Sequence, residues 1–484
     1  MRAEVLDEPE LEFGGGIRHI DPRFGIINYG PADLGAAEAP RAIRVGLIGP
    51  ADQLGGVRAW FERCREPITA KDDKYPHLFP EFPGCDIDLG LHTTLVFSDR
   101  NTRVVSDRDL RAIATATRAR ALQTAVDRYA EEITALADEN RVDVLIVARP
   151  EQLIDTTSRA ATRTTKQDAA ADAPEESGSD PALPRFANFH DVLKARVLQI
   201  RQPIQIIRRS TWDESTPPAT GRSRQDEASR AWNLHVALYY KAGGVPWRLP
   251  RNSTDLTTCY VGVAFYRNGD DALDTSVAQV FNERGDGVIV RGGPARVSRD
   301  DLQPHLTEQD AHALLLNALG TYHREHRTLP ARLVLHKTSS FTAAEIGGFQ
   351  AAGDERSLDT LEMSWITSSE GARLFRPGAA PPLRGTMLAL SDQEIVLYTK
   401  GSIEFYSTYP GMYVPQPIGI RPARPIHSAR DTGCETLTLT KMNWNQTRLD
   451  GRDPVTIRTA NQVKAILRFC TPDQAIATRY ANYM

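Results

Sequence analysis

The N-terminal half of the chain alternates short apolar runs with a longer stretch of helical periodicity. Residues 43–49 (IRVGLIG) and 142–147 (VDVLIV) are continuous apolar runs, typical of strands inside a parallel sheet that helices cover on both faces. Between them, apolar side chains recur every three or four residues and predict one helical stripe, formed by Leu122, Val126, Tyr129, Ile133 and Leu136. This order predicts a Rossmann-like α/β domain.

The pattern changes from about residue 251, where three strands are predicted in quick succession. They cover residues 260–266, 277–281 and 288–290, with Asn, Asp and Gly between them, which indicates an antiparallel meander. A helix is predicted from Thr307, with a capping-box-like start and an acidic first turn. Strands at 332–336, 361–366 and 387–398 and helices at 342–350 and 463–467 follow. This order predicts a ribonuclease-H-like fold.

The length of 484 residues favours two domains, which the change of pattern places at residues 1–250 and 251–484. A run at about 155–180, rich in Thr, Ala, Asp, Glu and Ser, is typical of a flexible insert in the first domain. The predicted class is therefore α/β, with a Rossmann-like domain followed by a ribonuclease-H-like domain.

Composition restricts the partners and the compartment. A net charge of -4 gives no global signature of nucleic-acid binding, so any nucleic acid has to meet a local basic surface. Five scattered cysteines without a C-x-x-C pair argue against a zinc site or a disulfide framework. The sequence has no apolar stretch long enough for a membrane span and no secretory leader, so we expect a cytoplasmic protein without a membrane partner.

Four polar side chains offer donors for one anion. His190 and Lys194 are four residues apart and share one helical face, Gln205 interrupts the apolar strand 203–207, and Lys241 ends a second helix just before two glycines. Each of these residues alone also has an ordinary explanation. A lysine at a helix C-terminus, for example, complements the helix dipole. The three glycines at 14–16 predict a turn and not a phosphate loop, since no Lys-Ser/Thr follows at the required spacing.

In this order the motifs H-x-x-x-K, P-I-Q and Y-K-A-G-G-V-P-W-R resemble the MID domain of short prokaryotic Argonautes, which consist of MID and PIWI domains. The opening segments LEFGGG, HIDPRFG and YGP resemble the start of the same family. The resemblance implies that the 5′ phosphate of a guide binds His190, Lys194, Gln205 and Lys241, although many long Argonautes have tyrosine in place of His190. It also implies Mg²⁺ bridging this phosphate to the C-terminal carboxylate of Met484.

The resemblance further implies that the PIWI domain is catalytically inactive. Active relatives carry metal-binding carboxylates where this chain has Ala264, Thr338 and Asn443, and two metal ions need several such ligands. Glu283 and Asp286 are predicted to lie in a surface turn, and Glu345 is predicted to be an exposed helical residue. The opposing hypothesis is that the chain itself cleaves nucleic acid, using Asp255, Glu283 and Asp286.

An inactive guide-binding chain implies a separate effector. The resemblance implies a 5′-phosphorylated guide RNA, a complementary single-stranded DNA target and a partner subunit with an APAZ domain. A sirtuin-like NADase is favoured as effector, ahead of a TIR NADase and a nuclease, and NAD⁺ depletion would cause abortive infection in antiviral defence. A guide-binding repressor without effector is the other alternative. Candidate contacts to the nucleic-acid backbone are Arg196, Arg208, Arg209, Arg248 and Arg251.

Overall fold

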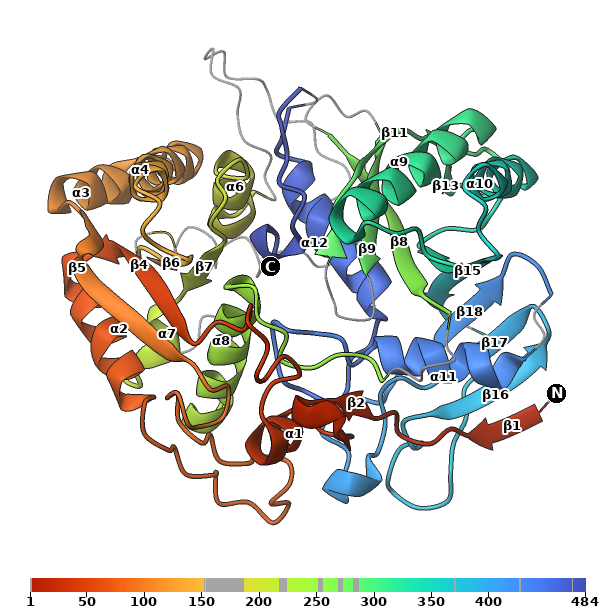
Figure 1. Cartoon of the computed structure of the whole chain (residues 1–484), viewed down its shortest axis with the longest axis horizontal. Helices are drawn as coiled ribbons and strands as arrows, with labels where there is room; N and C mark the ends of the chain where they lie inside the picture. Colours follow the sequence, from red (N-terminus) through yellow and green to blue (C-terminus); the bar gives the residue numbers. More distant parts are fainter. Residues whose placement is uncertain are drawn as a thin grey trace. The chain divides into compact units, whose positions relative to one another are not determined.

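The computed structural model describes residues 2–151, 153, 187–216, 224–250, 256–268, 273–281, 287–369, 371–425, 428–471 and 473–484. The predicted insert at 155–180 and the residues Arg251, Asp255, Glu283 and Asp286 lie outside these ranges. The chain divides into two compact units, the smaller formed by residues 42–66 and 94–226, the larger by residues 1–41, 67–93 and 227–484. Each unit is built around a sheet of its own (Figure 1).

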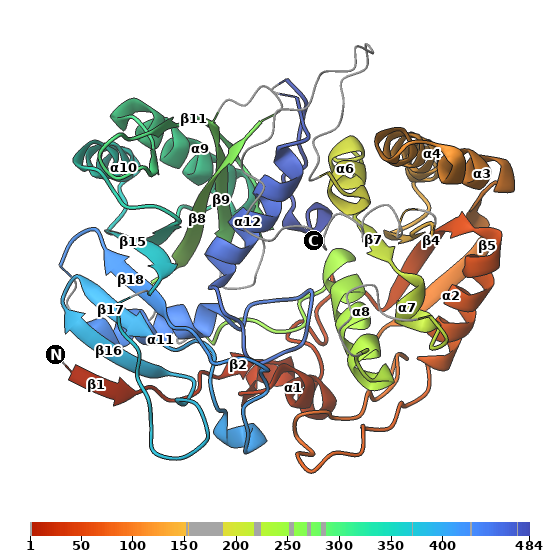
Figure 2. The same ribbon diagram turned by 180° about the vertical axis from the view of Figure 1, so that it is seen from behind.

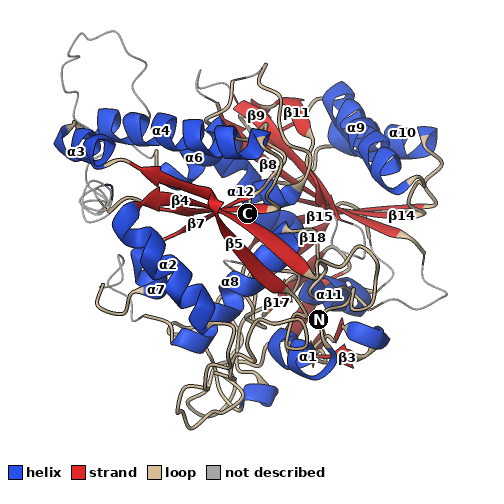
Figure 3. Ribbon diagram, turned by 60° about the vertical axis from the view of Figure 1, so that its left-hand side comes forward, coloured by secondary structure: helices blue, strands red, loops and turns tan. Residues whose placement is uncertain are grey.

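The smaller unit contains a parallel sheet in the order β5-β4-β6-β7. Its strands are β4 (Ala42–Pro50), β5 (Thr94–Val105), β6 (Val144–Ala148) and β7 (Ile204–Ile207). Its helices are α2 (Ala51–Arg63), α3 (Asp107–Thr115), α4 (Arg118–Asp138), α6 (Phe189–Arg196) and α7 (Arg209–Trp212). Helices α3, α4 and α6 lie on one face of the sheet and α2 and α7 on the other, as Figure 3 shows. This arrangement is the predicted Rossmann-like fold.

Burial explains why these segments form a covered parallel sheet. All five residues of β6 are buried, as the continuous apolar run predicted. The predicted stripe of α4 is buried along its whole length, from Leu122 to Leu136. Helix α4 ends at Asp138, and Asn140 then adopts a left-handed conformation with φ of 49°. Asn tolerates this conformation better than most residues, which explains the end of the helix there.

The larger unit contains a sheet in which ten strands are described. They are β1 (Arg2–Val5), β8 (Thr258–Arg267), β9 (Leu273–Phe281), β10 (Gly287–Val288), β11 (Arg291–Pro294), β14 (Arg332–Lys337), β15 (Thr360–Ser368), β16 (Thr386–Ser391), β17 (Glu394–Leu397) and β18 (Ile418–Pro422). Strands β8, β9 and β10 pair antiparallel, which confirms the predicted meander. Strand β14 then pairs parallel with both β8 and β15. This order is that of a ribonuclease-H-like fold.

Short hairpins and helices complete the larger unit. The hairpins are β2 (Leu11–Glu12) with β3 (Arg18–His19) and β12 (Arg296–Val297) with β13 (Pro304–His305). The helices are α1 (Pro22–Tyr29), α8 (Glu227–Lys241), α9 (Glu308–His326), α10 (Ala343–Glu355), α11 (Ala429–Leu439) and α12 (Val455–Leu467). Helix α8, which the sequence assigned to the first domain, belongs to this larger unit. The predicted domain boundary at residue 250 stays a prediction.

Alternate residues of β8 face different helices. Cys259, Val261, Val263 and Phe265 belong to the apolar core that also contains residues of α9 and α10. Gly262 faces α12, and a Cβ built on it would lie 2.0 Å from the carbonyl oxygen of Thr456. Only glycine permits this close approach of helix and strand. Figure 2 shows α12 lying along β8 and β9.

Two predicted elements have different bounds in the structure. The segment predicted as strand at 387–398 is a hairpin of β16 and β17, because the polar residues Ser391, Asp392 and Gln393 form the turn between them. The amide of Gln393 donates to the hydroxyl of Ser391 at 3.1 Å and closes this turn. The helix predicted at 463–467 begins much earlier, at Val455 directly after Pro454. Proline fixes the backbone torsion φ near its helical value and so favours a helix start.

Candidate nucleic-acid interface

Helix α6 positions two of the four predicted phosphate ligands. The side chain of Asn188 caps the helix by accepting a hydrogen bond of 3.0 Å from the amide of Asp191. Phe189 packs edge-on against Tyr129 of α4, with ring centroids 5.3 Å apart, and fixes the rotation of α6. His190 is half exposed, at 48% of its side chain, whereas Lys194, one turn further on, is buried. The two residues share a face, but only His190 reaches solvent.

Lys194 connects α6 to the strand that carries Gln205. Its Nζ donates to the carbonyl oxygen of Ile204 at 3.2 Å, directly next to Gln205 in β7. Burial lowers the pKa of Lys194 to about 7, although the negative charge of Asp191 acts in the opposite direction. A lysine with this pKa gains its full charge when an anion binds beside it.

His190 and Gln205 are the other two predicted phosphate ligands in the smaller unit. The Nδ1 of His190 lies 2.8 Å from the carboxylate of Asp191. The pKa of this carboxylate is lowered by hydrogen bonds from His190 and Asn188, which outweigh the effect of burial. Gln205 is partly buried, and its amide nitrogen donates to the carbonyl oxygen of Ile206 at 3.3 Å. Lys194 thus connects α6, which carries His190, with β7, which carries Gln205.

The fourth predicted ligand, Lys241, lies in the larger unit. It is the last residue of α8 and is buried. The neighbouring Tyr240 stacks on Trp444, with ring centroids 4.6 Å apart, and its ring also lies 6.3 Å from that of Tyr480. Gly243, with φ of 101°, turns the chain away just after the helix. A single pocket that combines Lys241 with Lys194 stays a prediction.

The C-terminal residues pack beside the end of α8, within the larger unit. They form a short 3-10 helix, Tyr480–Asn482, and the last residue, Met484, is buried. This aromatic segment therefore packs inward. Its proximity to α8 puts the C-terminal residues on the same side of the unit as Lys241. The role of the Met484 carboxylate in binding Mg²⁺ stays a prediction.

Two of the three positions at which the sequence predicts lost carboxylates are neighbours in space. In the parallel pairing of β14 with β8, Lys337 lies opposite Val263, and the amide of Thr338 donates to the carbonyl oxygen of Val263 at 3.1 Å. Thr338 therefore lies beside Ala264, which is fully buried. Within the described ranges, no cluster of three or more His, Cys, Asp or Glu side chains could hold a metal ion.

The third position, Asn443, is not brought to the other two. It lies in the loop between α11 and α12, where its side chain accepts from the amide of Asn445 at 3.2 Å. The indole of the next residue, Trp444, donates to the carbonyl oxygen of Trp247 at 3.2 Å. This loop packs on the chain that follows α8 and not on β8.

Helix α12, which the sequence analysis did not consider for this site, packs on β8 instead. Its first turn touches Gly262, and Cys470, just beyond its end, lies close enough to Tyr266 to influence its ionisation. The helix therefore runs in the same direction as β8. Two strand residues span about the same length as four helical residues, so Ala460, four residues after Thr456, comes to the level of Ala264.

The prediction that Glu345 is an exposed helical residue is wrong. Glu345 is completely buried, forms an ion pair with the buried Lys337 and accepts the amide of Leu306 at 2.9 Å. It also accepts the amide of Thr342 at 2.9 Å and so completes a capping box at the start of α10. His305 lies between Glu345 and Asp301, at 3.2 and 3.0 Å. Glu345 is the third residue of a capped helix and is close in sequence to Lys337. This position was the signal that could have revealed its buried role.

The predicted backbone-contacting arginines differ in their present partners. Arg209 is held by Asp213 at 2.8 Å and Glu151 at 3.2 Å, and Arg248 donates from Nε to Glu12 at 2.7 Å. Arg196 is exposed, with Asp127 at 3.7 Å, and Arg208 is exposed at the start of α7. Arg196 and Arg208 are therefore better placed than Arg209 to meet a phosphate.

Comparison with solved structures identifies the fold as that of Argonaute proteins. Clostridium butyricum Argonaute bound to a guide DNA and a 19-mer target DNA matches with a TM-score of 0.64 and 12% sequence identity, over 99% of this chain and 54% of that chain. Aa-Ago with externally bound siRNA matches with a TM-score of 0.58 and 14% identity, over 99% of this chain and 56% of that chain. A. aeolicus Argonaute matches with a TM-score of 0.56 and 13% identity, over 99% of this chain and 55% of that chain.

The chain thus has an Argonaute-like fold and spans about half the length of the solved Argonautes that it matches. No protein-family model and no curated protein matches the sequence. The chain itself contains the predicted Rossmann-like and ribonuclease-H-like parts. None of the helices in the described ranges combines the length and apolar character needed to cross a membrane.

Proposed function

We propose that this chain is the guide-binding subunit of a two-component sensor, in which a 5′-phosphorylated RNA guide recognises complementary single-stranded DNA. The observation that carries the proposal is the buried Lys194, held on the carbonyl of Ile204 beside Gln205, within an Argonaute-like fold. Charge-assisted hydrogen bonds to a terminal phosphate contribute roughly 1.5 to 3 kcal/mol each. Lys194, with Gln205 and His190, would then hold the guide's end.

Mg²⁺ fits this proposal on chemical grounds. Magnesium is usually bound by one or two carboxylates together with phosphate oxygens and water molecules. The C-terminal carboxylate of Met484 would supply one such ligand, and the guide phosphate would supply others. When bound, the ion would neutralise charge between the two anions, while Lys241, at the end of α8, would contribute a positive charge of the protein's own.

The proposal assigns the enzymatic step to a partner. Because Ala264 and Thr338 offer no metal ligands on the two central strands, we expect the chain itself not to cleave nucleic acid. Pairing of guide and target would activate a cytoplasmic subunit with an APAZ domain, for which a sirtuin-like NADase is favoured over a TIR NADase or a nuclease. NAD⁺ depletion would then protect the population by abortive infection.

The first experiment measures whether the protein distinguishes a phosphorylated from an unphosphorylated 5′ end of the guide. Fluorescence anisotropy compares 5′-phosphorylated with 5′-hydroxyl RNA of the same sequence. We expect Lys194→Met to weaken binding of the phosphorylated guide about tenfold or more and to leave the hydroxyl guide nearly unchanged. Lys71→Met is the matched control, since Lys71 is half exposed and has only surface contacts, with Asp73 at 3.9 Å and with the ring of Phe79 at 4.5 Å, among the residues described. Equal affinity of the wild-type protein for both guides contradicts the proposed pocket.

A second experiment tests the effector. The chain is co-purified with the product of the adjacent gene, and NAD⁺ is measured after addition of guide and either complementary or scrambled single-stranded DNA. Loss of NAD⁺ only with the complementary target supports the proposal. If DNA is degraded while NAD⁺ persists, the effector is a nuclease. Metal-dependent cleavage by the purified chain alone contradicts the assignment of catalysis to a partner.

A further inference from the structure

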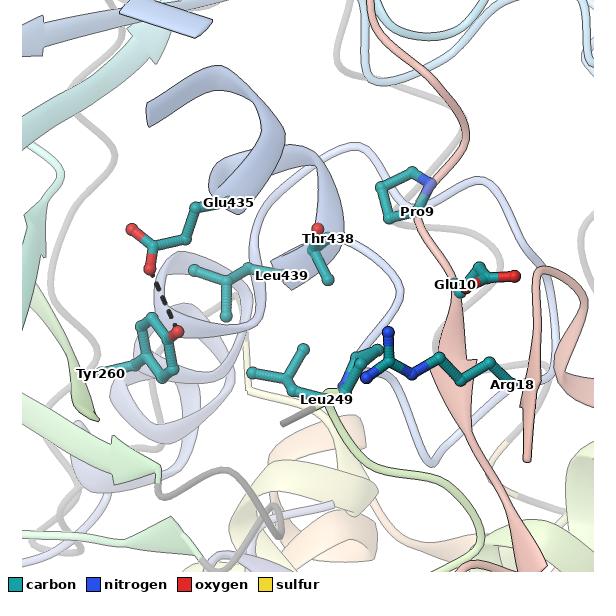
Figure 4. A pocket seen from close by; sticks show the side chains of 9 residues that line it. Pro9, Glu10, Arg18, Leu249, Tyr260, Glu435, Thr438 and Leu439 are labelled. Carbon is teal, nitrogen blue, oxygen red and sulfur yellow. Dashed lines mark hydrogen bonds between the residues drawn. The ribbon is translucent and has the colours of Figure 1, made fainter. Parts of the chain in front are cut away.

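Helix α11 borders two adjoining pockets in the larger unit. One, of about 560 Å³, lies against β14 and β15, and the other, of about 300 Å³, reaches the N-terminal segment. The residues of α11 and its cap that line them recur every three or four positions, and they are Ser428, Asp431, Thr432, Glu435, Thr438 and Leu439. Because both pockets share Glu435, they follow a single face of the helix. Figure 4 shows the smaller pocket, with Glu435 bonded to Tyr260 on one side and Glu10 and Arg18 on the other.

We call the two adjoining pockets together the α11 groove. Among its charged lining residues, carboxylates outnumber guanidinium groups. The carboxylates are Glu10, Glu362, Asp431 and Glu435, and the guanidinium groups are Arg18, Arg332 and Arg424. Arg332 is neutralised within the groove, since it binds Glu362 at 2.8 Å and Glu435 at 2.6 Å. Asp431 donates its backbone amide to the capping Ser428, while its carboxylate has no partner within the described ranges. The groove therefore favours a cation.

An independent observation points to a ligand in the same place. His336 lines the larger pocket and is 2% exposed. Its Nδ1 lies 2.9 Å from the hydroxyl of Thr456, and its Nε2 has no hydrogen-bond partner among the residues described. Burial and the neighbouring Arg332 lower the pKa of His336 to about 4, so the ring is neutral at pH 7. With hydrogen on Nδ1, donated to Thr456, Nε2 is an acceptor without a donor.

We propose that the α11 groove binds a linear ligand bearing alkyl ammonium groups, with the chemistry of a polyamine. Its ammonium groups would donate to Asp431 and His336, and its alkyl chain would lie on apolar lining residues such as Val334 and Met363. This site is separate from the proposed guide pocket on α6 and β7.

Isothermal titration calorimetry on the full chain, free of nucleic acid, tests the proposal with a matched pair of probes. Diaminooctane and octanediol have the same length and differ in charge. We expect the diamine to bind with a Kd of about 1 mM or lower and the diol not to bind. Equal binding of both compounds, or no binding of the diamine, overturns the proposal.

A matched pair of variants locates the site. Asp431→Asn removes the carboxylate without a partner and should weaken diamine binding about tenfold. Asp392→Asn removes the same charge from the exposed turn between β16 and β17 and should have no effect. If Asp431→Asn leaves the affinity unchanged, or if both variants lower it equally, the groove is not the site.

A third probe separates the two sources of this chemistry. Lysine side chains on an extended partner segment also present alkyl ammonium groups, so tri-lysine with blocked ends is titrated beside spermidine. Tighter binding of spermidine, sensitive to Asp431→Asn, supports a free polyamine. Tighter binding of the peptide shows that the groove receives a protein segment, which overturns the assignment to a polyamine.

Discussion

Lys337 and Lys194 are both almost completely buried, and their surroundings differ in one decisive respect. Lys337, at the end of β14, forms an ion pair with the equally buried Glu345 and lies near the rings of Phe265 and Phe341. Lys194, on α6, donates to the carbonyl of Ile204. Burial lowers the pKa of both side chains, to about 8 for Lys337 and about 7 for Lys194.

The difference shows what a buried lysine can do. A lysine paired with a buried carboxylate is already neutralised, and its environment has no need of an external anion. A lysine held on a carbonyl, with the carboxylate of Asp191 nearby, still gains from a phosphate. We therefore interpret Lys337 as structural and Lys194 as part of the binding site.

The largest expected effect comes from removing the charge that pairs with Lys337. Glu345→Gln leaves the ammonium group of Lys337 without its counter-charge and should lower the free energy of unfolding by about 3 to 5 kcal/mol. Chemical denaturation measures this change. Glu355→Gln, near the exposed end of the same helix, is the matched control and should change stability by less than about 0.5 kcal/mol. Equal destabilisation by both variants contradicts the proposed role of the pair.

A double variant sharpens the same point. Lys337→Met combined with Glu345→Gln removes both charges and should recover most of the stability that Glu345→Gln loses. No recovery would mean that the hydrogen bonds of Glu345 to Leu306 and Thr342, and not its charge, stabilise this region.

A smaller effect, about tenfold, concerns the pH dependence of guide binding. Lys194 binds phosphate as the ammonium form, so binding takes up a proton once the pH exceeds its pKa of about 7. The terminal phosphate loses its second charge below about pH 6. Affinity for the phosphorylated guide should therefore be greatest between about pH 6 and 7 and fall about tenfold towards pH 8. Anisotropy titrations across this range measure the profile. A flat profile above pH 7, or an unchanged profile in Lys194→Met, excludes Lys194 as the titrating group.

The smallest effect tests which arginines meet the nucleic-acid backbone. Arg208→Ala should lower the slope of log affinity against log salt concentration by about one, because it removes one phosphate contact. Arg209→Ala should change this slope little, since Asp213 and Glu151 already hold its guanidinium group. Binding of a phosphorylated guide at several salt concentrations measures both slopes. A larger change for Arg209→Ala would show that its ion pairs open on binding.

Much of the fold could be predicted because its signals are local. The apolar run of β6, the stripe of α4 and the cap at Thr307 each depend on neighbouring residues, and the structure confirms all three. The hairpin at β16 and β17 was missed because its turn, Ser391 to Gln393, interrupts an otherwise strand-like run for only three residues. In the site, the spacing of four residues between His190 and Lys194 predicted that both lie on one face of a helix.

The sequence by itself determined which residues share a helix face, which strands are apolar on both sides, and where the helix capped by Thr307 begins, because these depend on periodicity and local hydrogen bonds. Only the tertiary structure decided that Glu345 is buried against Lys337, that Thr338 lies beside Ala264, and that α12 rather than the loop of Asn443 packs on β8. Each of these depends on contacts between distant segments. Burial and charge pairing arise from such contacts, and they are the properties that distinguish Lys337, paired with Glu345, from Lys194, held on a carbonyl.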